Sequence, residues 1–292
     1  MKRILVTGAS GFLGWNLCRL FSKNHLVTGS YFSHRPAITS TKNLQLKPID
    51  LTRGNDVFEL IRKIRPEAII HTAAQSNPEI CQKNPQESYA INVESSVLLA
   101  KISADKGIPY VFTSSDLVFN GKSAPYNETD LLSPLSIYAQ QKVEAEQKIL
   151  SVYPKAAICR MPLMFGNTGN TGKSMMQSLL DALNQGKSIN LFSDEYRTPL
   201  NAEQATLGIQ LALEKVQGII HLGSTERISR FDLGMLIKKA FKINTGTINA
   251  TLQQDYQTDT PRPADVSLDI SRARSIGFNP PSINDQVKSL VV

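Results

Sequence analysis

The sequence predicts an α/β protein with a doubly wound parallel sheet and a smaller C-terminal lobe. The first observation is a short apolar run, Ile4–Val6, that leads into glycines at positions 8, 11 and 14 and then into an amphipathic helix. The second is a regular alternation of apolar strands and amphipathic helices up to residue 160, which is typical of βαβ units. The third is a change in the sequence pattern beyond Gly166, where the regular alternation ends and loops and short strands separate the helices. We therefore expect one part at 1–165 and a second at 166–292, from which segments near 202–225 return to the first.

Each further strand is expected where a short apolar run is bounded by turn residues, and each helix where apolar residues recur three or four apart. The predicted strands after the first lie at 26–31, 44–49, 68–71, 110–113, 156–160, 189–192 and 219–222. The predicted helices after the first lie at 55–64, 85–106, 136–153, 173–185, 202–215, 230–241 and 284–290. Their ends carry ordinary stop and start signals: Asn55 is the expected N-cap of one helix, Gly107 ends another, and Ser229 with Asp232 begins a third.

The three glycines of the first turn predict a phosphate cradle. Gly8 allows a tight turn, Gly11 lets a pyrophosphate approach the backbone, and Gly14 lets the helix pack closely against the strand. The free N–H groups at the start of the helix favour an anion. Because the turn follows a strand at the N-terminus, we expect the dinucleotide-binding site of a Rossmann fold.

The end of the second strand indicates which dinucleotide is bound. An Asp or Glu at this point accepts the 2′-hydroxyl of NAD, and this chain has no acidic residue there. It has Ser33, His34 and Arg35 instead, and a guanidinium pairs well with phosphate oxygens. The sequence therefore favours NADP over NAD.

Composition excludes several other classes. The formal net charge is +7, but no basic run exceeds two residues and none is interleaved with aromatic residues, so we expect no nucleic-acid partner. No apolar run approaches the roughly 18 residues of a membrane span, so we expect no membrane association. Three widely spaced cysteines lack the spacing of metal ligands and indicate buried thiols in a reducing compartment. We accordingly predict a cytoplasmic protein without a bound metal.

Tyr138 and Lys142 lie one helical turn apart and share a helix face. A lysine ammonium near the phenol favours the phenolate, and an oxidised nicotinamide adds to this effect. Ser115, at the carboxyl end of the fifth strand, is placed to hold or polarise a substrate carbonyl. With the glycine turn upstream, this set predicts hydride transfer between a nicotinamide cofactor and a substrate.

Through Thr7-Gly8-x-x-Gly11-x-x-Gly14, Ser115 and Tyr138-x-x-x-Lys142 the sequence resembles the extended short-chain dehydrogenase/reductase family. Within it, the chain is similar to dTDP-4-dehydrorhamnose reductases and their relatives, which include the regulatory β subunit of methionine adenosyltransferase. The stretches that carry this likeness lie at 114–121, 125–130, 133–138, 194–199, 262–263 and 268–269.

The resemblance implies a role for each matching residue. The expected catalytic residues are Tyr138 as proton donor, Lys142 as its partner, Ser115 to orient the carbonyl, and Asn92 to support a proton-relay water. The expected cofactor residues are Gly8, Ser10, Gly11, Phe12, Leu13 and Gly14 at the pyrophosphate, Ser33, His34 and Arg35 at the 2′-phosphate, Asp50 and Leu51 at the adenine, Ala73, Ala74 and Gln75 at the ribose, and Thr113, Ser114 and Lys142. The expected substrate residues are Gln75, Ser115, Asp116, Tyr138, Arg197 and Arg262, the two arginines at the phosphates of a sugar nucleotide.

Departures from the family pattern narrow the range of expected substrates and reactions. Ala139 replaces the usual glycine after the tyrosine, and Leu163 stands where rhamnose-forming reductases carry an aromatic residue. Sugar-nucleotide dehydratases place two acids after the strand-end hydroxyl, whereas this chain has Asp116 followed by Leu117. We therefore expect an NADP-dependent reductase of a keto-sugar nucleotide. A sugar-nucleotide epimerase and a cofactor-binding regulatory subunit remain the alternatives, and the oligomeric state stays open, a homodimer included.

Overall fold

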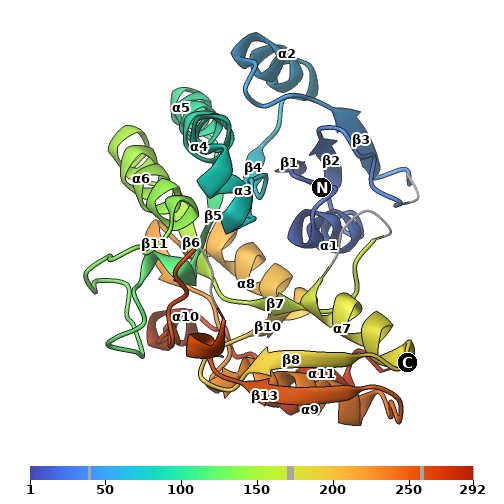
Figure 1. Cartoon of the computed structure of the whole chain (residues 1–292). Helices are drawn as coiled ribbons and strands as arrows, with labels where there is room; N and C mark the ends of the chain where they lie inside the picture. Colours follow the sequence, from blue (N-terminus) through green and yellow to red (C-terminus); the bar gives the residue numbers. More distant parts are fainter. Residues whose placement is uncertain (39–40, 170–173, 257–259, 292) are drawn as a thin grey trace.

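A seven-stranded parallel sheet forms the centre of the protein (Figure 1). The computed structural model describes residues 1–38, 41–169, 174–256 and 260–291. The strand order is β11-β6-β5-β4-β1-β2-β3, with the switch of direction between β1 and β4. Their bounds are β1 Arg3–Thr7, β2 Leu26–Tyr31, β3 Leu44–Pro48, β4 Ala68–His71, β5 Tyr110–Ser115, β6 Ala157–Met161 and β11 Gly218–His221. Ligands of such sheets bind at the carboxyl ends of the strands, near the switch point.

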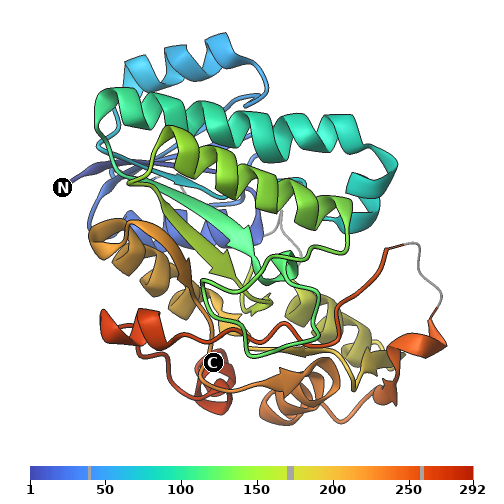
Figure 2. The same cartoon turned by 90° about the vertical axis from the view of Figure 1, so that its left-hand side faces the viewer.

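Helices cover both faces of this sheet, which confirms the predicted doubly wound α/β class. On one face α1 (Phe12–Phe21) packs against α8 (Ala202–Lys215). On the other face, α5 (Ser95–Lys106) and α6 (Ile137–Val152) lie side by side, with α2 (Gly54–Ile64) near the sheet edge (Figure 2). Each face has its own buried apolar core, because buried parallel strands are apolar on both sides.

A smaller group of elements lies below the sheet in Figure 1 and has its own apolar core. There β8 (Ser188–Phe192) pairs in parallel with β13 (Thr247–Thr251) beside three helices, α7 (Met175–Asn184), α9 (Arg230–Ala240) and α11 (Ile283–Lys288). Two-residue strands link the parts: β7 (Met164–Phe165) with β10 (Leu200–Asn201), and β9 (Tyr196–Arg197) with β12 (Ile228–Ser229). Between them, α8 and β11 return to the main sheet, where β11 pairs with β6.

The predicted helix at 85–106 is interrupted. It consists of α4 (Pro85–Tyr89), a π-helical turn at Ala90–Glu94, and α5. A π-helical turn adds a residue per turn and changes which side chains face inward, which is why such turns recur at functional sites. Hydrophobic spacing does not reveal the added residue, and this turn contains Asn92.

Other differences are smaller. The N-cap of α2 is Arg53 rather than Asn55, and the predicted helix start at Lys173 lies outside the described residues. β5 extends to Ser115, two residues beyond the predicted end. Not predicted were β13, the two-residue strands, α3 (Pro78–Lys83), α10 (Ser271–Ser275) and the 3₁₀ turns Asp116–Val118 and Gln253–Asp255. None of the helices in the described ranges has the length and hydropathy that crossing a membrane requires.

Candidate active site

The glycine turn between β1 and α1 has room for backbone only. Gly8 has a positive φ of 73°, and a Cβ there would lie 2.7 Å from the backbone nitrogen of Ala73. A Cβ on Gly14 would lie 2.1 Å from the carbonyl oxygen of Gly8. The N–H of Gly11 donates to that same carbonyl at 2.9 Å and closes the turn. The predicted roles of Gly8 and Gly14 in the turn and in helix packing therefore have a direct steric cause.

A buried hydrogen-bond network behind this turn was not predicted. Ser96 donates its hydroxyl proton to the carbonyl of Asn92 at 2.8 Å, so Nε2 of His71 must donate to the Ser96 oxygen, 2.9 Å away. Nδ1 of His71 is then an acceptor, and the hydroxyl of Thr7 donates to it at 2.6 Å. The Thr7 oxygen in turn accepts two backbone N–H groups of the loop after β4. The network joins the glycine turn to the π-helical turn.

The surroundings of the turn fit a dinucleotide. Ser30 and Ser114, at the ends of β2 and β5, have buried hydroxyls without a hydrogen-bond partner among the described residues. Ser33, His34 and Arg35 are exposed just after β2, and Ser33 Oγ lies 2.8 Å from Nδ1 of His34. The remaining predicted contacts line the same edge of the sheet: Ser10, Phe12 and Leu13 at the start of α1, Asp50 and Leu51 after β3, Ala73, Ala74 and Gln75 after β4, and Thr113 in β5. Asp50 is already engaged, since its carboxylate accepts two hydrogen bonds from Thr52.

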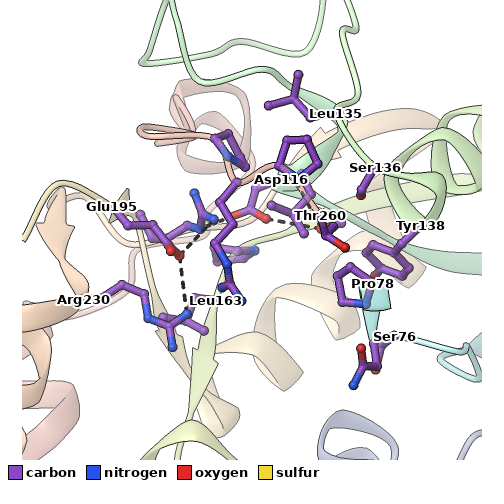
Figure 3. Close-up of a pocket in the computed structure, with 18 of the residues that line it drawn as sticks. Ser76, Pro78, Asp116, Leu135, Ser136, Tyr138, Leu163, Glu195, Arg230 and Thr260 are labelled. Atoms are coloured by element: carbon purple, nitrogen blue, oxygen red, sulfur yellow. Dashed lines mark hydrogen bonds and ion pairs between the residues drawn. The ribbon is translucent and has the colours of Figure 1, made fainter. Parts of the chain in front are cut away.

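A cavity of about 690 Å³ lies beside this edge, between the sheet and the smaller lobe (Figure 3). Its walls come from four regions: the start of α3, the end of β5, the start of α6 and the lobe. The polar and charged residues that line it are Ser76, Asn77, Glu79, Ser115, Asp116, Ser136, Tyr138, Glu195, Arg197, Arg230, Thr260 and Arg262. A cavity of this kind at the carboxyl ends of the strands is the place for a substrate.

Ser115 and Tyr138 meet in this cavity, as the sequence predicted. Ser115 Oγ donates to Asp116 at 3.2 Å and accepts the backbone N–H of Leu117 at 3.1 Å. Burial raises the pKa of Tyr138, the carboxylate of Asp116 raises it further, and the neighbouring hydroxyl of Ser115 lowers it. The phenol therefore holds its proton at neutral pH, which suits a proton donor.

Lys142 is anchored to the backbone of β5. Its Nζ donates to the carbonyl of Thr113 at 2.9 Å and lies 5.9 Å from the centre of the Tyr138 ring. Burial lowers the pKa of Lys142 to about 8, against the opposing charge of Glu146. Burial and Asp116 dominate the pKa of Tyr138 and raise it, and the predicted effect of Lys142 on the phenolate stays a prediction.

Asn92 is fully buried and holds the loop after β4. Its Oδ1 accepts the N–H of Gln75 at 2.8 Å, and its Nδ2 donates to the carbonyl of Gln75 at 3.1 Å and to Gln141 at 2.8 Å. Both amide hydrogens are thus used within the protein. Asn92 positions Gln75, and the described residues that line the cavity include neither of them.

Four charged side chains form a cluster in the cavity wall, and sequence reasoning missed two of them, Glu195 and Arg230. Arg197 Nη2 donates to Glu195 at 3.1 Å, and its Nε lies 3.5 Å from the carboxylate of Asp116. Arg230 Nη1 donates to the same oxygen of Glu195 at 3.4 Å (Figure 3). Burial raises the pKa of Asp116 to about 6, although Arg197 opposes this. No motif marks Arg230; only its position at the start of α9 brings it here.

Arg262 also lines the cavity, as predicted, but from an exposed position. Its guanidinium lies 5.8 Å from the ring centre of Phe192. Leu163 and Leu117, two of the three departures noted in the sequence, both line the cavity too. The residues that distinguish this chain from rhamnose-forming reductases and dehydratases are therefore in reach of a substrate.

The sequence profile of the RmlD substrate binding domain matches residues 1–292. Methionine adenosyltransferase 2 subunit beta of Xenopus laevis is 30% identical over 95% of this chain and 83% of its own length. The probable low-salt glycan biosynthesis reductase Agl14 of Haloferax volcanii is 30% identical over 98% of this chain and 96% of its own length.

Solved structures show the same fold. A hypothetical dTDP-4-dehydrorhamnose reductase from Sulfolobus tokodaii superposes with a TM-score of 0.81 at 31% identity, over 97% of this chain and 98% of its own. A dTDP-4-dehydrorhamnose reductase from Bacillus anthracis, in complex with NADP, superposes with a TM-score of 0.84 over 99% and 98% of the two chains. At 22% identity, this second likeness concerns the fold alone.

Proposed function

The chain belongs to the RmlD substrate binding domain family, and within it we propose that the protein is an NADP-dependent reductase of a keto-sugar nucleotide. The observation that carries the proposal is a buried Tyr138 beside Ser115 in a large cavity at the carboxyl ends of the strands, with burial raising the pKa of the phenol. The likeness to a reductase, Agl14, at 30% identity over nearly the whole chain supports it.

NADP is the cofactor that fits the chain's own residues. The turn at Gly8, which a Cβ would fill, and the unpaired hydroxyls of Ser30 and Ser114 fit a dinucleotide. The exposed Arg35 after β2 suits a 2′-phosphate, and no carboxylate follows that strand to accept a ribose 2′-hydroxyl. When bound, NADPH supplies the hydride.

The residues around the substrate carbonyl divide the remaining work. Ser115 orients the carbonyl by a hydrogen bond to its oxygen, for which it must exchange its present partner, Asp116. Tyr138 donates its proton to the same oxygen as the alcohol forms. Lys142 is tied to Thr113, where its ammonium can hold ribose hydroxyls and supports the phenolate that remains.

The side chains that line the cavity also indicate which substrate is bound. Leu163 and Leu117 present aliphatic side chains where related enzymes carry an aromatic residue or a second acid. We therefore propose a keto-sugar nucleotide other than dTDP-4-dehydrorhamnose. Dehydration needs the second carboxylate and is not proposed.

Tyr138→Phe tests the mechanism. Removing the proton donor should lower kcat for NADPH oxidation by roughly 100-fold or more, because general acid catalysis contributes about 10²–10⁴-fold. The assay is NADPH absorbance against a panel of keto-sugar nucleotides. Tyr153→Phe is the matched control, since Tyr153 caps the end of the same helix and its hydroxyl donates to the carbonyl of Ile108 at 3.0 Å. Full activity in Tyr138→Phe, or no turnover by the wild type with any substrate, would refute the proposal.

A second function has one observation in its favour, the 30% identity to a methionine adenosyltransferase subunit. A subunit role predicts a stoichiometric protein partner in pull-downs and no turnover with any sugar nucleotide. An epimerase on the same scaffold predicts tightly retained cofactor and no net NADPH consumption. These outcomes separate the three functions.

A further inference from the structure

The sequence predicted that Arg197 and Arg262 contact the phosphates of the substrate, but the contacts in the structure favour a different pair of arginines for this role. We propose that Arg230, together with Arg262, binds the diphosphate of the substrate, and that Arg197 is a buried counter-ion that positions Asp116 and Glu195. The inference rests on the proposed function, because it takes the substrate to be a nucleotide sugar.

Arg197 is already occupied. Its side chain is only 7% exposed. Each of its three nitrogens has a protein partner: Nη1 donates to the carbonyl of Tyr196 at 3.2 Å, Nη2 donates to Glu195 at 3.1 Å, and Nε lies 3.5 Å from Asp116. Losing these contacts would leave the buried carboxylate of Asp116 without its counter-ion and Glu195 with Arg230 alone, at a cost that a new phosphate contact has to exceed.

Arg230 is available. It is the first residue of α9, and its backbone N–H donates to the carbonyl of Glu195 at 3.0 Å, which fixes where its side chain starts. Its side chain is 23% exposed, lines the cavity, and makes one contact with a carboxylate, at 3.4 Å. A guanidinium with one weak partner and four further N–H groups is suited to a bidentate phosphate contact.

Arg230 and Arg262 line the same cavity and carry charges of the same sign. Burial lowers the pKa of Arg230; the charges of Arg197 and Arg262 lower it further, against the effect of Glu195. No carboxylate among the described residues lies within ion-pair distance of Arg262. An anion between these two guanidinium groups would relieve the repulsion, since opposite charges favour the charged form.

The position of Arg230 also suits a substrate that spans the cavity. Figure 3 shows Arg230 and Tyr138 on opposite sides of it, with Asp116 between them. A sugar carbonyl at Tyr138 then leaves the nucleotide end directed toward Arg230. The carboxylate of Asp116, which contacts Ser115, would repel a phosphate placed nearer the reacting end.

The test is the binding of thymidine diphosphate and uridine diphosphate to the NADP-loaded protein, measured by titration calorimetry. Arg230→Gln should weaken binding about tenfold or more, because a hydrogen-bonded phosphate–guanidinium pair is worth roughly 1.5–3 kcal/mol. Arg230→Lys keeps the charge and should lose less. Arg197→Gln should keep the affinity for diphosphate within about threefold while it lowers the melting temperature. Arg274→Gln, on the exposed helix α10, is the matched control.

Equal diphosphate affinity in Arg230→Gln and wild type, or a selective loss in Arg197→Gln, overturns the assignment and leaves the reductase proposal intact. Failure of wild type to bind either nucleoside diphosphate overturns this inference and also argues against a sugar-nucleotide substrate. The affinity for NADP and the thermal melt of each variant show whether it is folded. If Arg230→Gln does not fold, Arg230→Lys must show a measurable loss of diphosphate affinity for the assignment to stand.

Discussion

Two buried arginine–glutamate clusters occur in the part of the chain that the structure describes, and they differ in how completely their charged atoms are hydrogen-bonded. In the first, Arg160 contacts both carboxylate oxygens of Glu146, with a shortest distance of 2.8 Å, and both side chains are at most 2% exposed. His221 completes it: Nε2 lies 3.2 Å from Arg160, and Nδ1 donates to the carbonyl of Tyr126 at 3.1 Å. We call this the closed cluster.

The second, the cavity cluster, consists of Asp116, Glu195, Arg197 and Arg230. One oxygen of Asp116 and one of Glu195 have no hydrogen-bond partner among the described residues, and Arg230 reaches the cavity. The closed cluster ties the loop before α6 to β6 and β11, and every charged atom in it is used. We therefore interpret the closed cluster as a structural ion pair and the cavity cluster as a set of charges that bind a ligand. Buried charged atoms without hydrogen bonds destabilise the folded state, so they are expected where a ligand supplies the missing partner.

The largest expected difference is in stability. Glu146→Gln leaves the charge of Arg160 buried and uncompensated, and should lower the free energy of unfolding by about 3–5 kcal/mol. Glu195→Gln should cost only about 1–2 kcal/mol, because the cavity admits water to its cluster. Urea unfolding of both variants gives the two values. Equal losses would remove the distinction between the clusters.

Acid should change the stability of the protein in opposite directions through the buried histidines and through Asp116 of the cavity cluster. Burial lowers the pKa of His71 and of His221 to about 3, so the unfolded state binds protons first and stability is lost as pH falls below the unfolded value of 6.5. From pH 7.5 to pH 5 each histidine removes about 2 kcal/mol. The raised pKa of Asp116 has the opposite effect, because the folded state takes up a proton below about pH 6. This uptake increases the free energy of unfolding by about 1 kcal/mol over the same pH range.

Unfolding free energies at the two pH values check this sum, a net loss of about 3 kcal/mol. Asp116→Asn should deepen the loss by about 1 kcal/mol, and His221→Gln should reduce it. A protein as stable at pH 5 as at pH 7.5 would contradict the assignment of both histidines as buried and neutral.

The smallest effect concerns the titration of Asp116. Its protonation changes the partner of the Ser115 hydroxyl, so the pH profile of kcat should show an inflection near pH 6. Arg197→Gln removes the charge that opposes this pKa rise and should move the inflection upward by about one pH unit. Arg274→Gln should leave it in place. An unchanged inflection in Arg197→Gln means that Arg197 does not act on Asp116.

The fold was predictable to a large extent because its signals are local. The buried strands, the glycine turn and the Tyr138–Lys142 spacing each depend on residues close in sequence. The π-helical turn at Asn92 was not, since one extra backbone residue leaves the apolar pattern intact. Pairing of β13 with β8 likewise depends on partners about 60 residues apart.

The residues of the candidate site also fall into those that the sequence predicts and those that it does not. Ser115 and Tyr138 come from motifs and meet as predicted, whereas Glu195 and Arg230 are brought together only by the packing of the lobe. The role proposed for Arg197 differs from the predicted one because one of its partners, Asp116, is about 80 residues away in sequence. The pKa of Tyr138 likewise depends on burial, which residue spacing does not reveal.

The most direct test of the central claim follows a labelled hydride. NADPH with deuterium at the transferable C4 position is incubated with the protein and a keto-sugar nucleotide, and the product is analysed by mass spectrometry. The account predicts one deuterium on the former carbonyl carbon for each NADPH consumed, and a rate roughly 100-fold lower in Tyr138→Phe. Sugar products without deuterium, or no consumption of NADPH with any keto-sugar nucleotide, would contradict it.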